Sequence, residues 1–276
     1  MLRNPVLLPE SAAKLSNRNV PSKYLSSTVE FGRVAMAIGE AFSIPVLVVE
    51  TQMGASATQT VLNEILSDEL TANEYKVGSK KIDLRHKIVI RIGTAGGINC
   101  EGADPLKVGD VVNATHSIGT TGAVMQSLLG LDFWRPEVYA AFRALWVNLG
   151  SDFTYSKSVH PRVECSRDVV EAIEAAGSKL SQGWFHRGGN ITKDSLYAER
   201  QSDVFLDFCR TENCRTTEME LSAIAVAARE HQAYFGMLTA IVGVLPGSSY
   251  AEDEKTKRLG EHRAIQVGLE SINGLI

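Results

Sequence analysis

The sequence predicts an α/β fold in which helices cover a central β-sheet. Short apolar runs rich in β-branched residues alternate along the chain with segments whose apolar residues recur at helical spacing. The hydrophobic fraction of 44% over 276 residues is enough to build a sizeable core. No internal repeat, linker or low-complexity tract divides the chain, so we expect one domain over residues 1–276.

The first part of the chain predicts three strands and one helix. Residues 45–51, PVLVVET, form a short apolar run without alternation, which is typical of a buried strand. A turn of small residues follows at 52–57, and residues 58–70 then carry apolar side chains at helical spacing. We expect a second strand at 88–92, a glycine-rich loop directly after it, and a third apolar run at 108–114.

The rest of the chain continues the alternation after one interruption. Residues 131–161 are rich in aromatic side chains and irregular in pattern, and we interpret them as an insertion on the surface or at a subunit contact. The pattern beyond the insertion predicts helices at 167–180, 221–229 and 256–272, and strands at 185–192 and 234–245.

Charge and composition exclude several classes of protein. The formal net charge of −4 gives no reason to expect binding to nucleic acid or to a membrane surface. No segment approaches the run of about 18 apolar residues that a membrane-spanning helix needs, and the first residues do not resemble a secretory leader. The four cysteines form no C-x-x-C pair, so we expect free thiols, no bound metal and a cytoplasmic location.

The segment from Ile88 to Ile98, IVIRIGTAGGI, carries the strongest functional signal. Arg91 lies inside an apolar run, where a guanidinium is costly unless an anion meets it. The glycines that follow allow backbone N–H groups to approach such an anion closely. We interpret the segment as an oxyanion site, with phosphate as the expected anion, at the carboxyl edge of the sheet. The alternative is that Arg91 pairs with a carboxylate of its own fold.

Two further segments favour a pocket at that edge. The turn at 52–57, QMGASA, follows a neighbouring strand, and ligands collect at the carboxyl edge of open α/β sheets. The alternative for this turn is a capped helix start. Glu218 and Glu220 flank Met219 just before an alanine-rich helix. The two acids suit the dipole of that helix, or else they hold a vicinal diol such as that of ribose, with the methionine against the sugar.

Together these segments resemble the nucleoside phosphorylase-I family, and within it they are most similar to uridine phosphorylases. The motifs are RIGTAGGI, QMGASA after the VLVVET strand, and the Glu-Met-Glu triplet before the alanine-rich helix. The resemblance extends from about Pro5 to the C-terminus. It implies a central mixed, partly barrel-like β-sheet flanked by helices.

The resemblance also implies a phosphate site. Arg91 and Thr94 match the family's phosphate-binding arginine and threonine. Arg33 matches an arginine that reaches the phosphate of a neighbouring subunit, which implies a homodimer with shared active sites or a higher oligomer; an exposed surface arginine is the alternative. Lys14 lies near the place of an arginine in the family's N-terminal phosphate loop, where Glu10 replaces a glycine.

For the nucleoside, the resemblance implies a site on the Glu-Met-Glu triplet. Glu220 matches the glutamate that holds the ribose 2′- and 3′-hydroxyls, and together with Arg91 it forms the expected catalytic pair. Met219 is expected against the sugar, and Glu218 completes the ribose-binding group. Gly96 is expected to line the base pocket.

Recognition of the base is expected in the segment KDSLYAERQSD. Tyr197, Arg200 and Gln201 supply an aromatic ring, a guanidinium and an amide that suit the edge of uracil. A solvated helix start is the alternative for this segment. Purine-specific relatives place an aspartate after the last central strand, whereas this chain has no acid there before Glu252; Asp253 would supply one only by folding back.

We therefore expect a pentosyltransferase that cleaves uridine with phosphate into uracil and ribose 1-phosphate. Phosphate is the co-substrate, and the reaction calls for neither a metal nor an organic cofactor. One alternative keeps the family but changes the substrate or the nucleophile: a purine nucleoside phosphorylase or a nucleosidase. Another is a non-catalytic nucleoside-binding homologue, which Glu10 and the altered base segment would fit.

Overall fold

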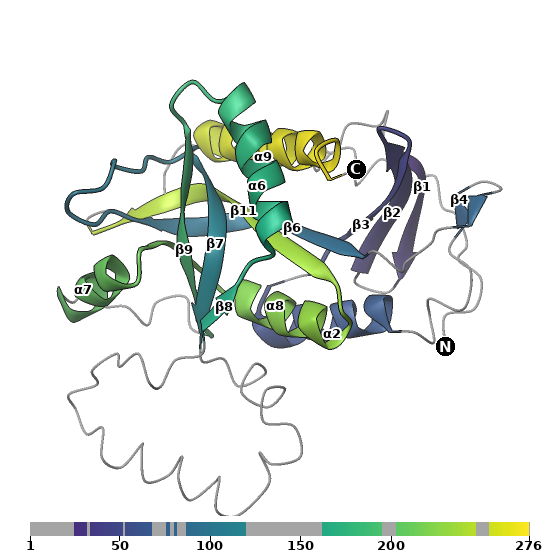
Figure 1. Cartoon of the computed structure of the whole chain (residues 1–276), viewed down its shortest axis with the longest axis horizontal. Coiled ribbons are helices and arrows are strands. Elements are labelled where there is room, and N and C mark those ends of the chain that lie inside the picture. Colours follow the sequence, from purple (N-terminus) through teal and green to yellow (C-terminus); the bar gives the residue numbers. More distant parts are fainter. Residues whose placement is uncertain are drawn as a thin grey trace, which may run out of the picture.

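The computed structural model of the chain describes nine stretches, which hold every element discussed below (Figure 1). These are residues 25–31, 34–51, 53–67, 76–77, 80–81, 87–119, 162–194, 203–246 and 254–275. The insertion expected at 131–161 lies outside the described residues.

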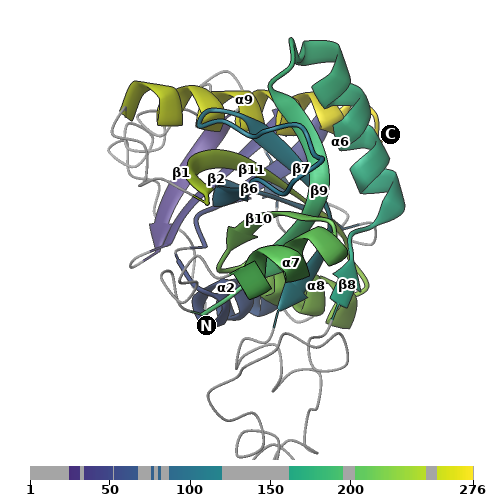
Figure 2. The same cartoon turned by 90° about the vertical axis from the view of Figure 1, so that its left-hand side faces the viewer.

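A closed ring of five strands forms the centre of the fold (Figures 1 and 2). The strands pair in the order β11–β6–β10–β9–β7, and β7 pairs again with β11; β8 adds to the outside of β7. Three pairings in the ring are parallel and two are antiparallel. The strands are β6 (Ile88–Ile98), β7 (Val111–Gly119), β8 (Arg162–Glu164), β9 (Phe185–Thr192), β10 (Cys214–Glu218) and β11 (Tyr234–Leu245). The mixed, barrel-like sheet that the resemblance implied is thus confirmed.

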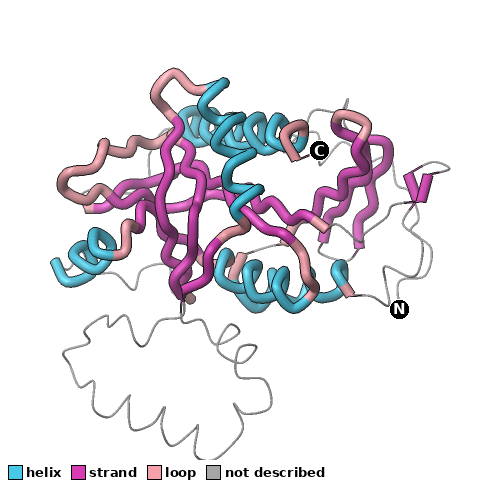
Figure 3. The backbone as a smooth tube through the Cα atoms, in the orientation of Figure 1, coloured by secondary structure: helices cyan, strands magenta, loops and turns pink. Residues whose placement is uncertain are grey.

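Helices cover this ring on two sides and at one end (Figures 1 and 3). Helices α6 (Arg167–Leu180) and α9 (Glu254–Ile272) lie together on one side, and α2 (Ala55–Leu66) and α8 (Leu221–Glu230) lie on the other. Helix α7 (Asp203–Thr211) packs near β10. An antiparallel sheet of β1 (Leu25–Phe31), β2 (Val34–Ala41) and β3 (Ile44–Val49) stands apart from the ring, as does the small β4–β5 pair (Lys76–Val77 and Lys80–Lys81).

The hydrophobic core follows this arrangement of helices. Ile224 of α8 packs with Phe235 and Met237 of β11 in one cluster. Ile173 of α6 packs with Leu238 of β11 in a second cluster, on the side of α6 and α9. Every residue of α8 from Leu221 to Ala228 is buried, which explains why this helix is built largely of alanine: small side chains let it approach both the sheet and α2.

Most of the predicted elements are present at nearly the predicted bounds. Helix α6 and strands β9 and β11 begin and end where the sequence predicts, and α8 is one residue longer. Helix α2 begins at Ala55 instead of residue 58, so residues 55–57 of the turn expected at 52–57 belong to its first turn. The third strand starts at Val111 and runs on to Gly119. Strands β1, β2, β4, β5, β8 and β10 and helix α7 were not predicted.

The glycine-rich loop after residue 92 was predicted wrongly, because β6 continues without a break to Ile98. The glycines are needed for close packing between strands and not for a turn. A Cβ on Gly97 would lie 3.0 Å from a methyl group of Ile241 and 3.3 Å from Leu106. A Cβ on Gly96 would lie 3.3 Å from Thr217 on β10, its partner across the antiparallel pair. Tertiary packing therefore overrides the low strand propensity of glycine.

Two further expectations concern the cysteines and membrane-spanning segments. All four cysteines are free thiols, as predicted, and three of them are buried. None of the helices in the described parts of the chain combines the length and the apolar character needed to cross a bilayer.

A substitution in α6 tests the core on that side of the ring. Ile173 is fully buried, so Ile173→Ala should lower the free energy of unfolding by about 2–5 kcal/mol. Leu180, at the end of the same helix, is 38% exposed, and Leu180→Ala should change it by about 0.5 kcal/mol at most. Denaturant titration of both variants measures the difference, and equal losses would contradict the assigned packing.

Candidate active site

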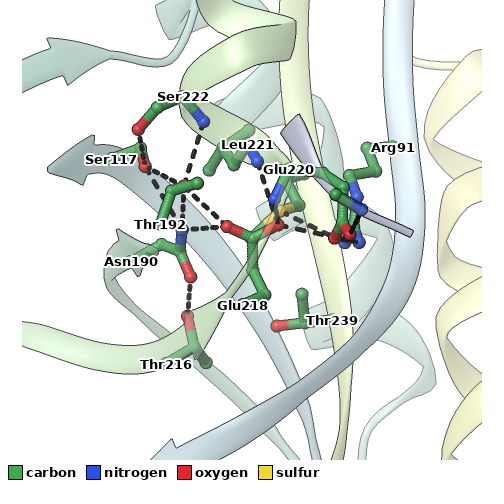
Figure 4. A network of polar contacts seen from close by, with 12 residues as sticks. Arg91, Ser117, Asn190, Thr192, Thr216, Glu218, Glu220, Leu221, Ser222 and Thr239 are labelled. Atoms are coloured by element: carbon green, nitrogen blue, oxygen red, sulfur yellow. Dashed lines mark hydrogen bonds and ion pairs between the residues drawn. The ribbon is translucent and has the colours of Figure 1, made fainter. Parts of the chain in front are cut away.

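Three segments that are far apart in the sequence meet at one end of the ring (Figure 4). Strand β6 contributes Arg91, and the junction between β10 and α8 contributes Glu218 and Glu220. The start of α2 contributes the backbone N–H of Gly54. The cation predicted to bind phosphate and the carboxylate predicted to bind ribose are therefore direct neighbours.

Arg91 and Glu220 form an ion pair with little access to solvent. Nη2 of Arg91 donates to Oε2 of Glu220, and the two side chains are 12% and 6% exposed. Oε2 of Glu218 lies 3.6 Å from the same nitrogen. Arg91 thus pairs with a carboxylate of its own fold, which was the alternative to an anion site. Because the partner is the expected ribose ligand, the pair joins the two predicted subsites.

Glu220 is held from a second side by α2. The Gly54 N–H donates to Oε1 of Glu220 at 2.6 Å, so each carboxylate oxygen has a different partner. Burial raises the pKa of the Glu220 carboxyl above its ordinary value, whereas the positive charge of Arg91 lowers it; the Glu218 carboxylate raises it further, and the bond from Gly54 lowers it. The net shift is upward, because burial is the largest of these effects.

Glu218 is buried more deeply than Glu220, and its carboxylate accepts four hydrogen bonds. Oε1 accepts from Nδ2 of Asn190 and from the hydroxyl of Thr192, both at 2.7 Å. Oε2 accepts the backbone N–H groups of Glu220 at 2.7 Å and Leu221 at 2.9 Å, at the start of α8. These bonds use much of the acceptor capacity of the group. Glu218 was expected to contact ribose, but its oxygens face the protein.

A buried chain of polar side chains lies behind Glu218 (Figure 4). The hydroxyl of Ser117 on β7 lies 2.9 Å from that of Thr192 and 2.9 Å from that of Ser222 on α8. The Ser222 N–H donates to the Thr192 hydroxyl at 3.0 Å. The Thr216 hydroxyl donates to Oδ1 of Asn190 at 2.9 Å. These hydrogen-bonded side chains connect three strands of the ring, β7, β9 and β10, to the first turn of α8.

Gly93 makes room for the Arg91 side chain. The guanidinium extends along β6 to Gly93, and a Cβ at position 93 would overlap it. Residues two apart on a strand share a face, which explains why position 93 must be free of a side chain. Nη1 of Arg91 also lies 3.6 Å from Sδ of Met237, its register partner on β11.

Three other predicted site residues fall in the described segments, namely Thr94, Gly96 and Met219. Thr94 is exposed and follows Arg91 by three positions on a continuous strand, so regular alternation turns the two side chains to opposite faces. Gly96 lies opposite Thr217, beside the Glu-Met-Glu triplet. Met219 is half-buried between the two glutamates. The binding roles of these residues stay predictions.

The other predicted site residues lie outside the described part of the chain. They are Lys14 and Arg33 for phosphate, and Tyr197, Arg200 and Gln201 for the base. Their roles also stay predictions. No group of three side chains suited to hold a metal ion occurs within the described residues.

The partners that hold the two glutamates were not predicted from the sequence. Gly54 was read only as part of a turn or pocket, and Asn190, Thr192 and Ser117 were not singled out. A signal was present, however. Asn190 and Thr192 are polar residues two apart in a strand predicted to be buried, and polar groups on one buried face need partners there.

The sequence and the structure were both compared with known proteins. Residues 7–273 match a family model described as the phosphorylase superfamily. Comparison of the sequence with curated proteins found no match.

Solved structures of several enzymes share the fold. A Trypanosoma brucei nucleoside phosphorylase, described as showing uridine phosphorylase activity, matches with a TM-score of 0.64 and 17% identity over 96% of this chain and 90% of its own. Purine nucleoside phosphorylase from Toxoplasma gondii matches with a TM-score of 0.63 and 17% identity over 95% of this chain and 86% of its own. The 5′-methylthioadenosine/S-adenosylhomocysteine nucleosidase of Neisseria meningitidis matches with a TM-score of 0.57 and 16% identity over 96% and 94%. At these identities the matches establish the fold.

Removing the Arg91 charge should change the titration of Glu220. Because this charge lowers the pKa of Glu220, Arg91→Met should raise that pKa further. Carbon-13 NMR of labelled glutamate carboxyls measures the shift. Arg167→Met serves as the control, since that side chain is 86% exposed and pairs with Glu171 on the surface of α6. An unchanged or lower pKa in a folded Arg91→Met variant would contradict the ion pair.

Proposed function

The chain belongs to the phosphorylase superfamily, and from this we propose that it cleaves uridine with phosphate into uracil and ribose 1-phosphate. The observation that supports the proposal most is the contact between Arg91 and Glu220. A cation able to bind phosphate lies directly beside a carboxylate able to accept hydrogen bonds from a vicinal diol. The reaction needs these two groups side by side, because phosphate must reach C1′ of the sugar.

In the proposed reaction, phosphate binds at Arg91 and meets the sugar that Glu220 holds. The guanidinium offers a planar pair of donors that suits phosphate oxygens. Glu220 turns the ribose hydroxyls toward itself and so aligns C1′ with the nucleophile. Alignment of two bound reactants supplies up to roughly 7–11 kcal/mol of the barrier in favourable cases.

Bond making and bond breaking follow from this alignment. A phosphate oxygen forms a bond to C1′ while the bond from C1′ to N1 of uracil breaks. The electron pair of the broken bond stays on uracil, which leaves as an anion. Arg200 and Gln201 are proposed to stabilise this charge, with Tyr197 against the ring, by electrostatic interactions in a site of low dielectric constant.

The phosphate site is proposed to form between two copies of the protein. We infer a homodimer in which Arg33 of one copy completes the phosphate site of the other. Lys14 is proposed to contact the phosphate bound in its own copy. In the cytoplasm, the activity would serve pyrimidine salvage by recovering uracil and a phosphorylated sugar.

Hydrolysis in place of phosphorolysis is the second candidate. The specific observation in its favour is that Glu220 already occupies the guanidinium of Arg91, so a phosphate ion has to compete with a buried carboxylate. A water molecule acting as the nucleophile would not have to displace Glu220 from Arg91. The sugar product of this hydrolysis would be free ribose.

One experiment separates the candidates. The protein is incubated with uridine, thymidine, inosine and adenosine, each with and without phosphate, and the sugar product is identified. We expect uracil and ribose 1-phosphate from uridine only when phosphate is present. Uracil release that ignores phosphate would favour hydrolysis, and preferential cleavage of inosine would contradict the preference for a pyrimidine. Ligand-induced thermal stabilisation without cleavage would indicate a binding protein.

Substitution of Arg91 tests the phosphate site. Arg91→Met should lower kcat/KM for phosphate by on the order of 100- to 1000-fold, the usual effect of removing one donor to a developing charge. Binding of uridine should change little, which equilibrium titration measures. Arg167→Met on the surface of α6 is the control and should retain full activity. An unchanged rate in Arg91→Met would refute the assignment.

The dependence of the rate on pH tests Glu220. The carboxyl accepts hydroxyl protons only when ionised, and its pKa is raised by burial. We therefore expect kcat/KM for uridine to fall as the pH is lowered through a pKa above the usual value of about 4.3 for glutamate. Glu220→Gln should be slower and should lack this acidic limb. A limb that persists unchanged in Glu220→Gln would have another origin, such as the phosphate itself.

A further inference from the structure

We propose that Asn190 and Thr192 are positioning residues for Glu220, which act by fixing the carboxylate of Glu218 against the start of α8. In this view Glu218 does not bind ribose, and it is the anchor that sets where Glu220 lies beside Arg91. The inference rests on the proposed function for its kinetic test, although a second test below is independent of activity.

The side-chain amide of Asn190 has a fixed orientation because its nitrogen and its oxygen face different kinds of partner. Nδ2 donates to Oε1 of Glu218 at 2.7 Å, and Oδ1 accepts from the Thr216 hydroxyl at 2.9 Å. A flipped amide would turn its oxygen toward the Glu218 carboxylate, which offers only acceptors. The side chain therefore specifies a carboxylate oxygen at this point.

Thr192 connects Glu218 to α8 directly. Its hydroxyl donates to Oε1 of Glu218 at 2.7 Å and accepts the Ser222 N–H at 3.0 Å. Ser222 lies in the first turn of α8, where backbone N–H groups have no partner within the helix. The Thr192 hydroxyl thus donates a hydrogen bond to the carboxylate and accepts one from the first turn of the helix.

The other oxygen of Glu218 completes the attachment of α8. Oε2 accepts the N–H groups of Glu220 and Leu221, so this carboxylate caps the helix from the strand that precedes it. Glu218, Asn190 and Thr192 are each at most 4% exposed. Water is therefore kept from replacing a lost bond, and a removed partner leaves a buried polar group unsatisfied.

The consequence for Glu220 follows from the backbone. Its N–H is held by Glu218, and its own carboxylate reaches Arg91 and the Gly54 N–H. A shift of the β10–α8 junction would move this carboxylate away from the sugar it is proposed to hold. Misplacement of a reacting group by about 1 Å costs about 100-fold in rate.

An exchange of functional groups between positions 190 and 218 tests this inference. Glu218→Gln keeps one oxygen for the two N–H groups of α8, but it turns an amide donor toward the Asn190 donor. Asn190→Asp alone places two carboxylates together, which is unfavourable when both are ionised. The double variant Asn190→Asp with Glu218→Gln restores a donor opposite an acceptor and leaves the total charge unchanged.

The kinetic measurement compares uridine with 2′-deoxyuridine, which lacks one hydroxyl that Glu220 is proposed to hold. Each single variant should lose about 100-fold in kcat/KM for uridine and much less for 2′-deoxyuridine. The double variant should recover most of the preference for uridine. Glu212→Gln is the matched control, since it changes another buried carboxylate, which pairs with Arg162.

Amide hydrogen exchange provides the measurement that does not depend on catalysis. In Glu218→Gln the N–H groups of Glu220 and Leu221 bond to a neutral oxygen, and the side chain is displaced by the Asn190 donor. These groups should therefore exchange roughly 10- to 100-fold faster and return toward the wild-type rates in the double variant. If the wild-type protein cleaves no nucleoside, the proposed function fails, while the exchange rates still decide the positioning role.

Three outcomes would overturn the inference. These are exchange rates in Glu218→Gln equal to those of the wild type, equal losses for the two nucleosides in the single variants, and no recovery in a folded double variant. If Glu218→Gln does not fold, Thr192→Val and Thr192→Ser supply the same contrast. Only the serine variant keeps the hydroxyl, so only that variant should retain the preference for uridine and the slow exchange.

Discussion

The structure around the site depends on one constraint: two carboxylates and one guanidinium share a poorly solvated end of the strand ring. Arg91 neutralises one of the two negative charges of Glu218 and Glu220. Burial of the remaining charge is costly unless hydrogen bonds surround it. The donors come from Gly54 at the start of α2, from two backbone groups of α8 and from side chains of β9. The need to balance this charge explains why so many separate segments converge here.

Much of the fold was predictable because its elements have strong local patterns. The bounds of α6, β9 and β11 follow from periodicity alone. Strand β6 was truncated in the prediction because glycine disfavours strands, and only the neighbouring strands reveal that residues 93–97 must pack closely. Strand β10, CRTTE, lacks an apolar run, and it is buried by its neighbours β6 and β9 and by helix α7.

The candidate site was predictable only in part, and for a physical reason. The resemblance identified Arg91 and Glu220, because binding phosphate calls for a cation and binding a vicinal diol calls for a hydrogen-bond acceptor. Glu218 was predicted to bind ribose together with Glu220 because the two acids lie two residues apart in the same motif. The turn between β10 and α8 nevertheless directs the carboxylate of Glu218 to Asn190 and that of Glu220 to Arg91. That Asn190 and Thr192 face Glu218 follows from the parallel pairing of β9 with β10, which one sequence does not reveal.

The closure of the ring has a consequence for how copies of the protein associate. Each of the five ring strands has a neighbour on both sides, because β7 pairs with β9 and again with β11. A closed sheet offers no free row of backbone groups to a strand of another molecule. The five ring strands are therefore closed to edge-to-edge pairing with a second copy, whereas the short strand β8, which pairs with β7 alone, keeps an outer edge. Any contact made through the ring has to use side chains and loops, so that substitutions on the surface can remodel it without disturbing the backbone that carries Arg91.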